Sequence, residues 1–117
     1  MYKILVYVSG CMTPNDVCPS FDDNLRRLER VSRDLFLLGY AVYCPYERWF
    51  DEDEQITAEL KREPYGDMYR KVIAMDLCIL KRCDIIVMTK HWRWSKGAQI
   101  EYDFALQNDI TIWEFNQ

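Results

Sequence analysis

Histidine, basic charge and long apolar runs are scarce in this chain, and each scarcity excludes a class of protein. One histidine, His91, stands among 117 residues, so a histidine-rich metal site is excluded. The longest unbroken apolar run covers residues 4–8, far below the roughly 20 residues of a membrane span and too short for the core of a signal peptide. We therefore expect no membrane partner and a cytoplasmic location.

Basic residues do not outnumber acidic ones. The chain has 15 Lys and Arg against 19 Asp and Glu, a formal net charge of −4, and a pI near 5.0. Binding along a phosphate backbone needs a basic face, so polymeric nucleic acid is not an expected partner. A local anion site built from backbone N–H groups is compatible with this charge.

The five cysteines match no zinc module, because neither their number nor their spacing fits one. We expect reduced thiols, no structural metal and no cofactor. Cys44, Cys78 and Cys83 lie within apolar segments, where a free cysteine packs as a small hydrophobic side chain.

The composition is that of one globular domain. Half of the residues are hydrophobic, 29% are charged and 15% are aromatic, which supplies both a core and a wettable surface. A chain of this length is too short for two full domains, so residues 1–117 are expected to form one.

Strand and helix patterns alternate along the chain. Four short segments rich in β-branched and aromatic residues are expected to be strands: residues 3–9, 40–44, 83–89 and 109–113. Apolar positions at helical spacing predict helices over residues 22–38, which Gly39 ends, and over 67–82 and 98–107. Residues 46–66 are an acidic excursion, a candidate lid, with a short helix reaching Arg62 before Pro64.

This order predicts an α/β fold with an open, mostly parallel, three-layer sheet of four to five strands, of the flavodoxin or Rossmann-like type. Right-handed crossovers bring the loops that follow the strands to the carboxyl edge of the sheet, where such folds bind ligands. Residues 10–15 and 91–97 both begin at that edge.

Asp76 is the first residue whose position calls for an explanation. It lies four residues from both Val72 and Leu80, on the apolar stripe of its predicted helix. A carboxylate on a buried face needs a partner or a function. Pairing with an arginine or capping a neighbouring loop explains it as well as catalysis does.

Glu101 is the second carboxylate of interest. It lies in the first turns of the last predicted helix, and its neighbours on the same face, Gly97, Ala98 and Ala105, are all small, which leaves room for a ligand. Ser95 is expected to cap this helix, and Ser95 with Gly97 would suit an anionic group such as a phosphate. An acid stabilised by the helix N-terminus is the commoner explanation.

Other residues are expected near the same edge. Tyr7 ends the first predicted strand, and Gly10 and Thr13 belong to the loop after it. Trp92, with Trp49, Phe50 and Trp94, suggests stacking on a base, although packing or a subunit interface explains these aromatics equally well.

Taken together, these residues resemble the nucleoside 2-deoxyribosyltransferase superfamily, including its 2′-deoxynucleoside 5′-phosphate N-hydrolase branch and small phage and bacterial relatives. The likeness covers nearly the whole chain. It depends on Val6, Tyr7 and Gly10, on Asp76 followed by Cys83 and Asp84, and on the segment Ser95-x-Gly97-x-x-x-Glu101-x-x-x-Ala105.

The resemblance implies a role for each residue of the motifs. Glu101 would be the nucleophile at the anomeric carbon, Asp76 would assist proton transfer or positioning, and Tyr7 would orient Glu101. Ser95 stands where transferases of the superfamily tend to carry an acid, and a serine there resembles the N-hydrolase branch, where it helps to hold a 5′-phosphate. The first loop departs from that branch, because residues 10–15 contain one glycine and no arginine.

The leading hypothesis is therefore cleavage, by hydrolysis or base transfer, of the N-glycosidic bond of a nucleoside or nucleoside 5′-monophosphate. Glu101, Asp76 and Tyr7 would act in catalysis, and Gly10, Thr13, Ser95, Gly97 and Trp92 would bind the substrate. A non-catalytic nucleotide-binding or regulatory module is one alternative, and an interaction protein that uses exposed aromatics is another. Relatives of this superfamily are usually oligomers, and we expect a homodimer.

Overall fold

The sheet of this protein contains four parallel strands among the residues that the computed structural model describes, which are 3–45, 54–63 and 65–115. The strands are β1 (Leu5–Ser9), β2 (Ala41–Tyr43), β3 (Ile85–Met88) and β4 (Thr111–Glu114), and their order in the sheet is β2-β1-β3-β4. The predicted α/β fold with an open parallel sheet is confirmed.

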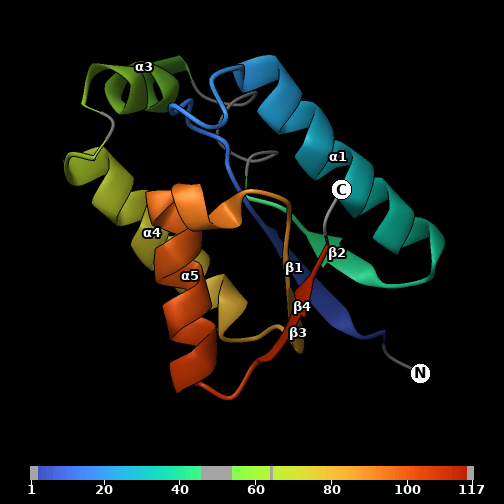
Figure 1. The fold of residues 1–117 in the computed structure, drawn as a ribbon. Helices are drawn as coiled ribbons and strands as arrows, with labels where there is room; N and C mark the ends of the chain where they lie inside the picture. The colour runs from blue at the N-terminus through green and yellow to red at the C-terminus, as the bar shows by residue number, and fades with distance from the viewer. Residues whose placement is uncertain (1–2, 46–53, 64, 116–117) are drawn as a thin grey trace.

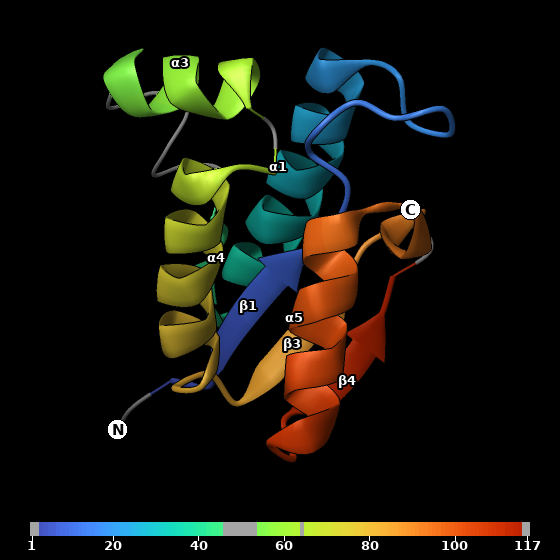
Figure 2. The same cartoon turned by 90° about the vertical axis from the view of Figure 1, so that its left-hand side faces the viewer.

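Helices cover both faces of the sheet, as Figures 1 and 2 show. Helix α1 (Phe21–Leu37) lies on one face, and α4 (Asp67–Leu80) and α5 (Lys96–Gln107) lie on the other. Helix α3 (Glu54–Arg62), the short helix expected in the acidic excursion, lies beyond the carboxyl ends of the strands (Figure 2). Trp49 and Phe50, expected at the rim of the site, lie outside the described residues.

Alternation along the strands divides the core in two. Val6 and Val8 of β1 point toward α1 and pack with Leu28, Val31 and Leu35 of that helix. Tyr7, between them, points to the opposite face, because successive side chains of a strand alternate. Its cluster contains Leu80 of α4, Ala98 and Ala105 of α5, and Ile86 and Met88 of β3. The sheet is therefore buried on both sides, as expected for parallel strands.

Helix α1 has a local signal at each end, of which the glycine at its carboxyl end was predicted. The hydroxyl of Ser20 caps α1 by accepting a hydrogen bond from the backbone N–H of Asp23 at 3.2 Å. Gly39 follows the last turn of this helix with a φ of +100°, a conformation that glycine adopts without the steric cost of a side chain.

The strand order places a topological switch point between β1 and β3. From β1 the chain moves to β2 on one side, and later from β3 to β4 on the other, so the loops after β1 and β3 diverge. Open α/β sheets bind ligands in the crevice that such diverging loops leave. The fold itself therefore points to residues 10–15 and 89–97 as the lining of a site.

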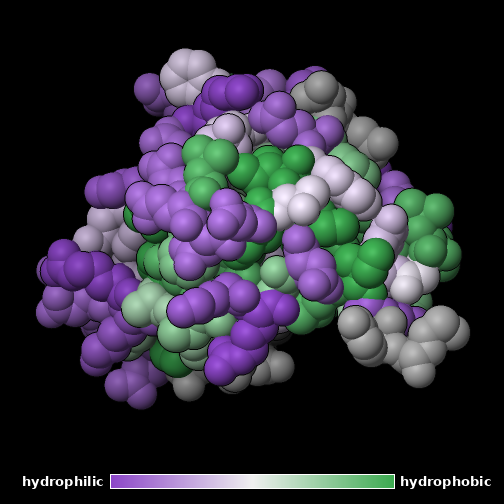
Figure 3. Space-filling view, turned by 90° about the horizontal axis from the view of Figure 1, so that it is seen from below, coloured by the Kyte–Doolittle hydropathy of each residue, from purple (hydrophilic) through white to green (hydrophobic). Residues whose placement is uncertain are grey.

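The surface combines charged side chains with apolar ones. Seen from below, hydrophobic side chains gather around the middle of the molecule, and hydrophilic ones lie to the left of them and along the top and bottom of the view (Figure 3). All five cysteines are free, and Cys78 is exposed rather than packed, because it lies on the solvent side of α4. Among the described residues, no helix is long and apolar enough to cross a membrane.

Candidate active site

Glu101 is a buried carboxylate on the inner face of α5. The hydroxyl of Ser95 caps this helix, as predicted, by accepting a hydrogen bond from the N–H of Ala98 at 3.2 Å. Glu101 follows one turn later and is 6% exposed, flanked on its face of the helix by the buried small side chains of Ala98 and Ala105. The small neighbours leave the carboxyl group open to the space in front of it.

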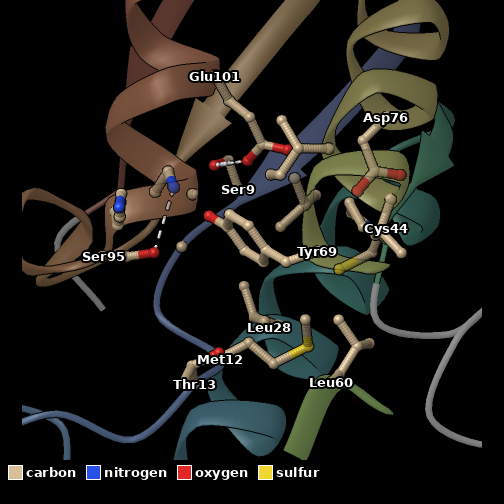
Figure 4. Close-up of a pocket in the computed structure, with 18 of the residues that line it drawn as sticks. Ser9, Met12, Thr13, Leu28, Cys44, Leu60, Tyr69, Asp76, Ser95 and Glu101 are labelled. Atoms are coloured by element: carbon tan, nitrogen blue, oxygen red, sulfur yellow. Dashed lines mark hydrogen bonds between the residues drawn. The ribbon is translucent and has the colours of Figure 1, made fainter. Parts of the chain in front are cut away.

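Strand β1 supplies a hydrogen bond to each oxygen of Glu101. The hydroxyl of Tyr7 donates to Oε2. The hydroxyl of Ser9 donates to Oε1 at 2.6 Å, as Figure 4 shows. Tyr7 and Ser9 are two residues apart in a strand and so point to the same face of the sheet. Two donors on two oxygens fix the orientation of the carboxyl plane.

The protonation of Glu101 reflects opposing effects. Burial raises the pKa of its carboxyl group to about 7, and the hydrogen bonds from Ser9 and Tyr7 oppose this rise because they favour the charged form. Such a group exchanges its proton near neutral pH, where a nucleophile or a general acid and base is useful.

Asp76 supplies a second buried carboxylate from α4. It is 3% exposed, and its Oδ1 accepts a hydrogen bond from the hydroxyl of Tyr43 at 3.3 Å. Tyr43 pairs with Tyr7 across β2 and β1, with ring centroids 5.5 Å apart. Burial raises the pKa of Tyr7, and the charges of Glu101 and Asp76 raise it further, so both carboxylates act on the same small region.

A pocket at the carboxyl edge of the sheet joins these groups. Its cavity of about 110 Å³ is lined by the end of β1 and the loop after it, by α3, α4 and the first turns of α5, and by both Asp76 and Glu101 (Figure 4). This volume is small beside the roughly 300–1,000 Å³ of sites that enclose a drug-sized ligand. A ligand of that size would extend beyond the cavity.

Four of the five predicted binding residues line this pocket: Gly10, Thr13, Ser95 and Gly97. The structure also shows that each of the two glycines lies against a neighbouring side chain, with little space for a Cβ. A Cβ at Gly10 would lie 1.8 Å from Oγ1 of Thr89, and one at Gly97 would lie 3.1 Å from the hydroxyl oxygen of Tyr69. Both glycines therefore admit a neighbouring side chain as well as facing the pocket.

Trp92, the fifth predicted binding residue, does not line the pocket. Its indole is buried in the core, stacks on Tyr102 at 4.4 Å between ring centroids, and donates a hydrogen bond to Oε1 of Glu114 at 2.8 Å. The short helix η1 (Trp92–Trp94) turns the two tryptophans in different directions, and Trp94 lines the pocket instead. Trp92, expected to bind substrate, is therefore not among the residues that line this pocket, whereas Trp94 is.

Hydrogen bonds hold the two loops of the site together. Asn15 donates from Nδ2 to the backbone oxygen of Trp94 at 3.2 Å, and the thiol of Cys11 donates to the backbone oxygen of His91 at 3.0 Å. Asn24, buried on α1, donates to the backbone oxygens of Met12 and Cys18. The loop after β1 is thus fixed to both α1 and the loop after β3.

Sequence reasoning missed Ser9 and Tyr69. Strand alternation was the signal for Ser9, because it lies two residues after Tyr7. Tyr69 lies seven residues before Asp76 on the same face of α4, and its ring extends across the pocket toward α5 (Figure 4). Its buried hydroxyl has no hydrogen-bond partner in the described part of the chain.

Metal-binding side chains do not cluster in the described residues, where no group of three or more His, Cys, Asp and Glu is arranged to hold an ion. Among the described residues, the donors at the site include the hydroxyls of Tyr7, Ser9 and Tyr69 and the N–H groups at the start of α5, and the acceptors include the two carboxylates.

The chain matches a known protein family. The sequence model of a family described as a domain of unknown function (DUF4406) matches residues 4–114. The match covers nearly the whole chain, which therefore belongs to this family. A search of curated proteins gave no match.

Proposed function

We propose that this member of the DUF4406 family cleaves the N-glycosidic bond of a nucleoside or nucleoside 5′-monophosphate, with Glu101 as nucleophile. One observation carries the proposal: a buried glutamate, held by a hydrogen bond on each oxygen, faces a pocket that contains a second buried carboxylate. Paired carboxylates are the groups that glycosidic cleavage uses. The motifs that resemble the nucleoside 2-deoxyribosyltransferase superfamily agree with it.

In the first step, Glu101 attacks the anomeric carbon of the sugar. Its carboxylate forms a bond to that carbon as the carbon–nitrogen bond breaks, and the base leaves with the bonding electron pair and a proton from Asp76. The product is a sugar ester of Glu101. The hydroxyls of Tyr7 and Ser9 orient the carboxylate for this attack.

In the second step, water or a second base attacks the same carbon and releases Glu101 as a carboxylate. Asp76, now ionised, takes the proton that the attacking group loses, which restores both carboxyl groups. Hydrolysis and base transfer differ only in this acceptor. The reaction needs no cofactor in either case.

The polar groups of the pocket support a sugar or nucleotide ligand. The hydroxyl of Tyr69 is buried without a partner in the described residues, and an unsatisfied buried donor costs roughly 1–3 kcal/mol. The first turn of α5, with Ser95 and Gly97, supplies N–H groups and the positive end of the helix dipole to the same pocket. A ligand with oxygen acceptors would satisfy both.

Incubation with a panel of nucleosides and nucleoside monophosphates, with and without an acceptor base, tests this proposal. Chromatography should detect free base from at least one substrate with the wild-type protein and none with Glu101→Gln. Release of base by both proteins would show that Glu101 is not the nucleophile. No release from any substrate, with a nucleotide still raising the melting temperature, would favour a nucleotide-binding module instead.

The proposal includes a homodimer in the cytoplasm. Apolar side chains at the carboxyl end of α1 and just beyond it, Phe36, Leu37 and Leu38, are each more than half exposed, and pairing of two chains would cover such side chains. Light scattering should give twice the 14.1 kDa mass of one chain, and a mass of 14.1 kDa at all concentrations would contradict the dimer.

A further inference from the structure

We propose that Ser9 is a positioning residue for Glu101, held in place by Thr89 in the space that Gly10 leaves open. The kinetic part of this inference rests on the proposed function, whereas the structural part does not. Its basis is a chain of contacts between the ends of β1 and β3 that leads from Gly10 to the carboxyl group of Glu101.

The first contact fixes the backbone of Ser9. Its carbonyl oxygen accepts two hydrogen bonds from Thr89, one from the backbone N–H at 2.9 Å and one from the side-chain hydroxyl at 3.0 Å. Thr89 is itself 1% exposed, so no water competes for these bonds. Two buried hydrogen bonds from one residue therefore hold the backbone of Ser9 in place.

Gly10 makes the second bond possible. The hydroxyl of Thr89 occupies the position of a Cβ at residue 10, because such an atom would lie only 1.8 Å from Oγ1. Any other residue at position 10 would displace Thr89, and the side-chain bond to Ser9 would be lost. The glycine of this loop is thus needed for the positioning of Ser9.

The last contact acts on Glu101. Ser9 is 2% exposed and donates from Oγ to Oε1 at 2.6 Å, while Tyr7 donates to Oε2. With one donor, the carboxyl group would still turn about its bond to Cγ, but with a donor on each oxygen it is fixed in one plane. The bond from Ser9 also favours the ionised form, because a carboxylate is the better acceptor.

A carboxyl titration followed by NMR tests the structural part without any assay. Protein labelled with ¹³C at the glutamate carboxyl groups is titrated as wild type, Ser9→Ala and Ser9→Cys, and the Glu101 signal is assigned by its absence in Glu101→Gln. Ser9→Ala should raise the pKa of Glu101 by roughly 1 unit, the size expected for a lost hydrogen bond to a charged group. Ser9→Cys keeps a weaker donor and should give a smaller rise.

Ser32 supplies a matched control. It is a buried serine on α1 whose hydroxyl has no hydrogen-bond partner in the described residues. Ser32→Ala removes the same atom from the core but leaves the surroundings of Glu101 intact, so its Glu101 titration should equal that of the wild type. Thr89→Val should shift the titration in the same direction as Ser9→Ala, by less.

Kinetics test the positioning role. Ser9→Ala should lower kcat about tenfold or more, leave KM within about twofold, and move the acidic limb of the pH profile upward by the shift that NMR measures. An unchanged Glu101 titration in Ser9→Ala would overturn the inference. A change confined to KM would overturn it too, because Ser9 would then bind substrate. If the wild type releases no base, the proposed function fails, and the titration alone decides whether Ser9 positions Glu101.

Discussion

The hydroxyl of Tyr7 donates a hydrogen bond to Oε2 of Glu101, although the two residues are 94 positions apart in the sequence. Tyr7 lies in the middle of β1 with no exposed surface, and Glu101 lies on the helix that packs over that strand. Because β1 is the second strand of the sheet, flanked on both sides, the tyrosine provides a rigid support for the glutamate.

Replacing Tyr7 with phenylalanine removes that support and keeps the ring. Tyr7→Phe should lower kcat by roughly 10- to 100-fold and shift the acidic limb of the pH profile upward, since Glu101 loses a bond that favours its ionised form. Steady-state kinetics between pH 5 and 9 measure both effects.

Tyr43→Phe is the matched control for this experiment. It removes a hydroxyl from the same face of the sheet, but one that bonds to Asp76 and not to Glu101. The acidic limb that Glu101 governs should therefore stay in place. Equal shifts in the two variants would show that the limb does not report on the Tyr7 bond.

The raised pKa of Glu101 makes stability depend on pH. Between the ordinary glutamate value of 4.5 and about 7, the folded protein holds a proton that the unfolded chain has released, so this group's contribution to the free energy of unfolding falls as pH rises. The glutamine of Glu101→Gln cannot ionise, so this variant does not lose stability in this way as pH rises. Its melting temperature should exceed that of the wild type by more at pH 8 than at pH 5. Between these two pH values, the wild type should lose on the order of 2–3 kcal/mol of stability relative to Glu101→Gln. A difference in melting temperature between Glu101→Gln and the wild type that stays constant with pH would contradict the raised pKa of Glu101.

Gly10→Ala should destabilise the fold, because its Cβ would overlap Oγ1 of Thr89 and would lie 3.2 Å from Cδ2 of Leu28. We expect a loss of about 1–3 kcal/mol in the free energy of unfolding, measured by urea denaturation. Adding Thr89→Ala removes the overlapping oxygen and should recover part of this loss. No recovery in the double variant would mean that the glycine is needed for another reason.

The two tryptophans of η1 should behave in opposite ways. Trp92→Phe loses the bond to Glu114 and should cost about 1–2 kcal/mol of stability, with KM unchanged. Trp94 is 62% exposed and lines the pocket, so Trp94→Ala should raise KM severalfold and change stability little. If KM rises in Trp92→Phe and not in Trp94→Ala, then Trp92 rather than Trp94 binds the substrate.

Much of the fold was predictable because the relevant signals are local. Residues 3–9 carry a β-branched run that ends at Gly10, and the structure has β1 at Leu5–Ser9. The apolar spacing of residues 22–38 and the following glycine gave α1 within one residue at each end. Asp76 was predictable as unusual because it lies on a face that the helical period marks for burial, and Glu101 was predictable because its neighbours on the same face of the helix are all small.

The missed features depend on tertiary packing. Whether Trp92 or Trp94 faces the pocket is decided by the turn of η1, where His91 adopts a φ of +68° that its sequence neighbours do not predict. The bond from Ser9 to Glu101 joins a strand to a helix 92 positions away, which no local pattern encodes. The reason for Gly10 is visible only once Thr89 is placed beside it.

The most direct test of the account is to detect the sugar ester on Glu101. The protein is mixed with a substrate identified by base release, quenched in acid within the first turnover, digested and analysed by mass spectrometry. We predict a mass increase on the peptide that contains Glu101 in the wild type, of a pentose for a nucleoside or of a pentose phosphate for a nucleoside monophosphate, and none in Glu101→Gln. Base release in a single turnover with the sugar found on another residue, or on none, would contradict Glu101 as the nucleophile.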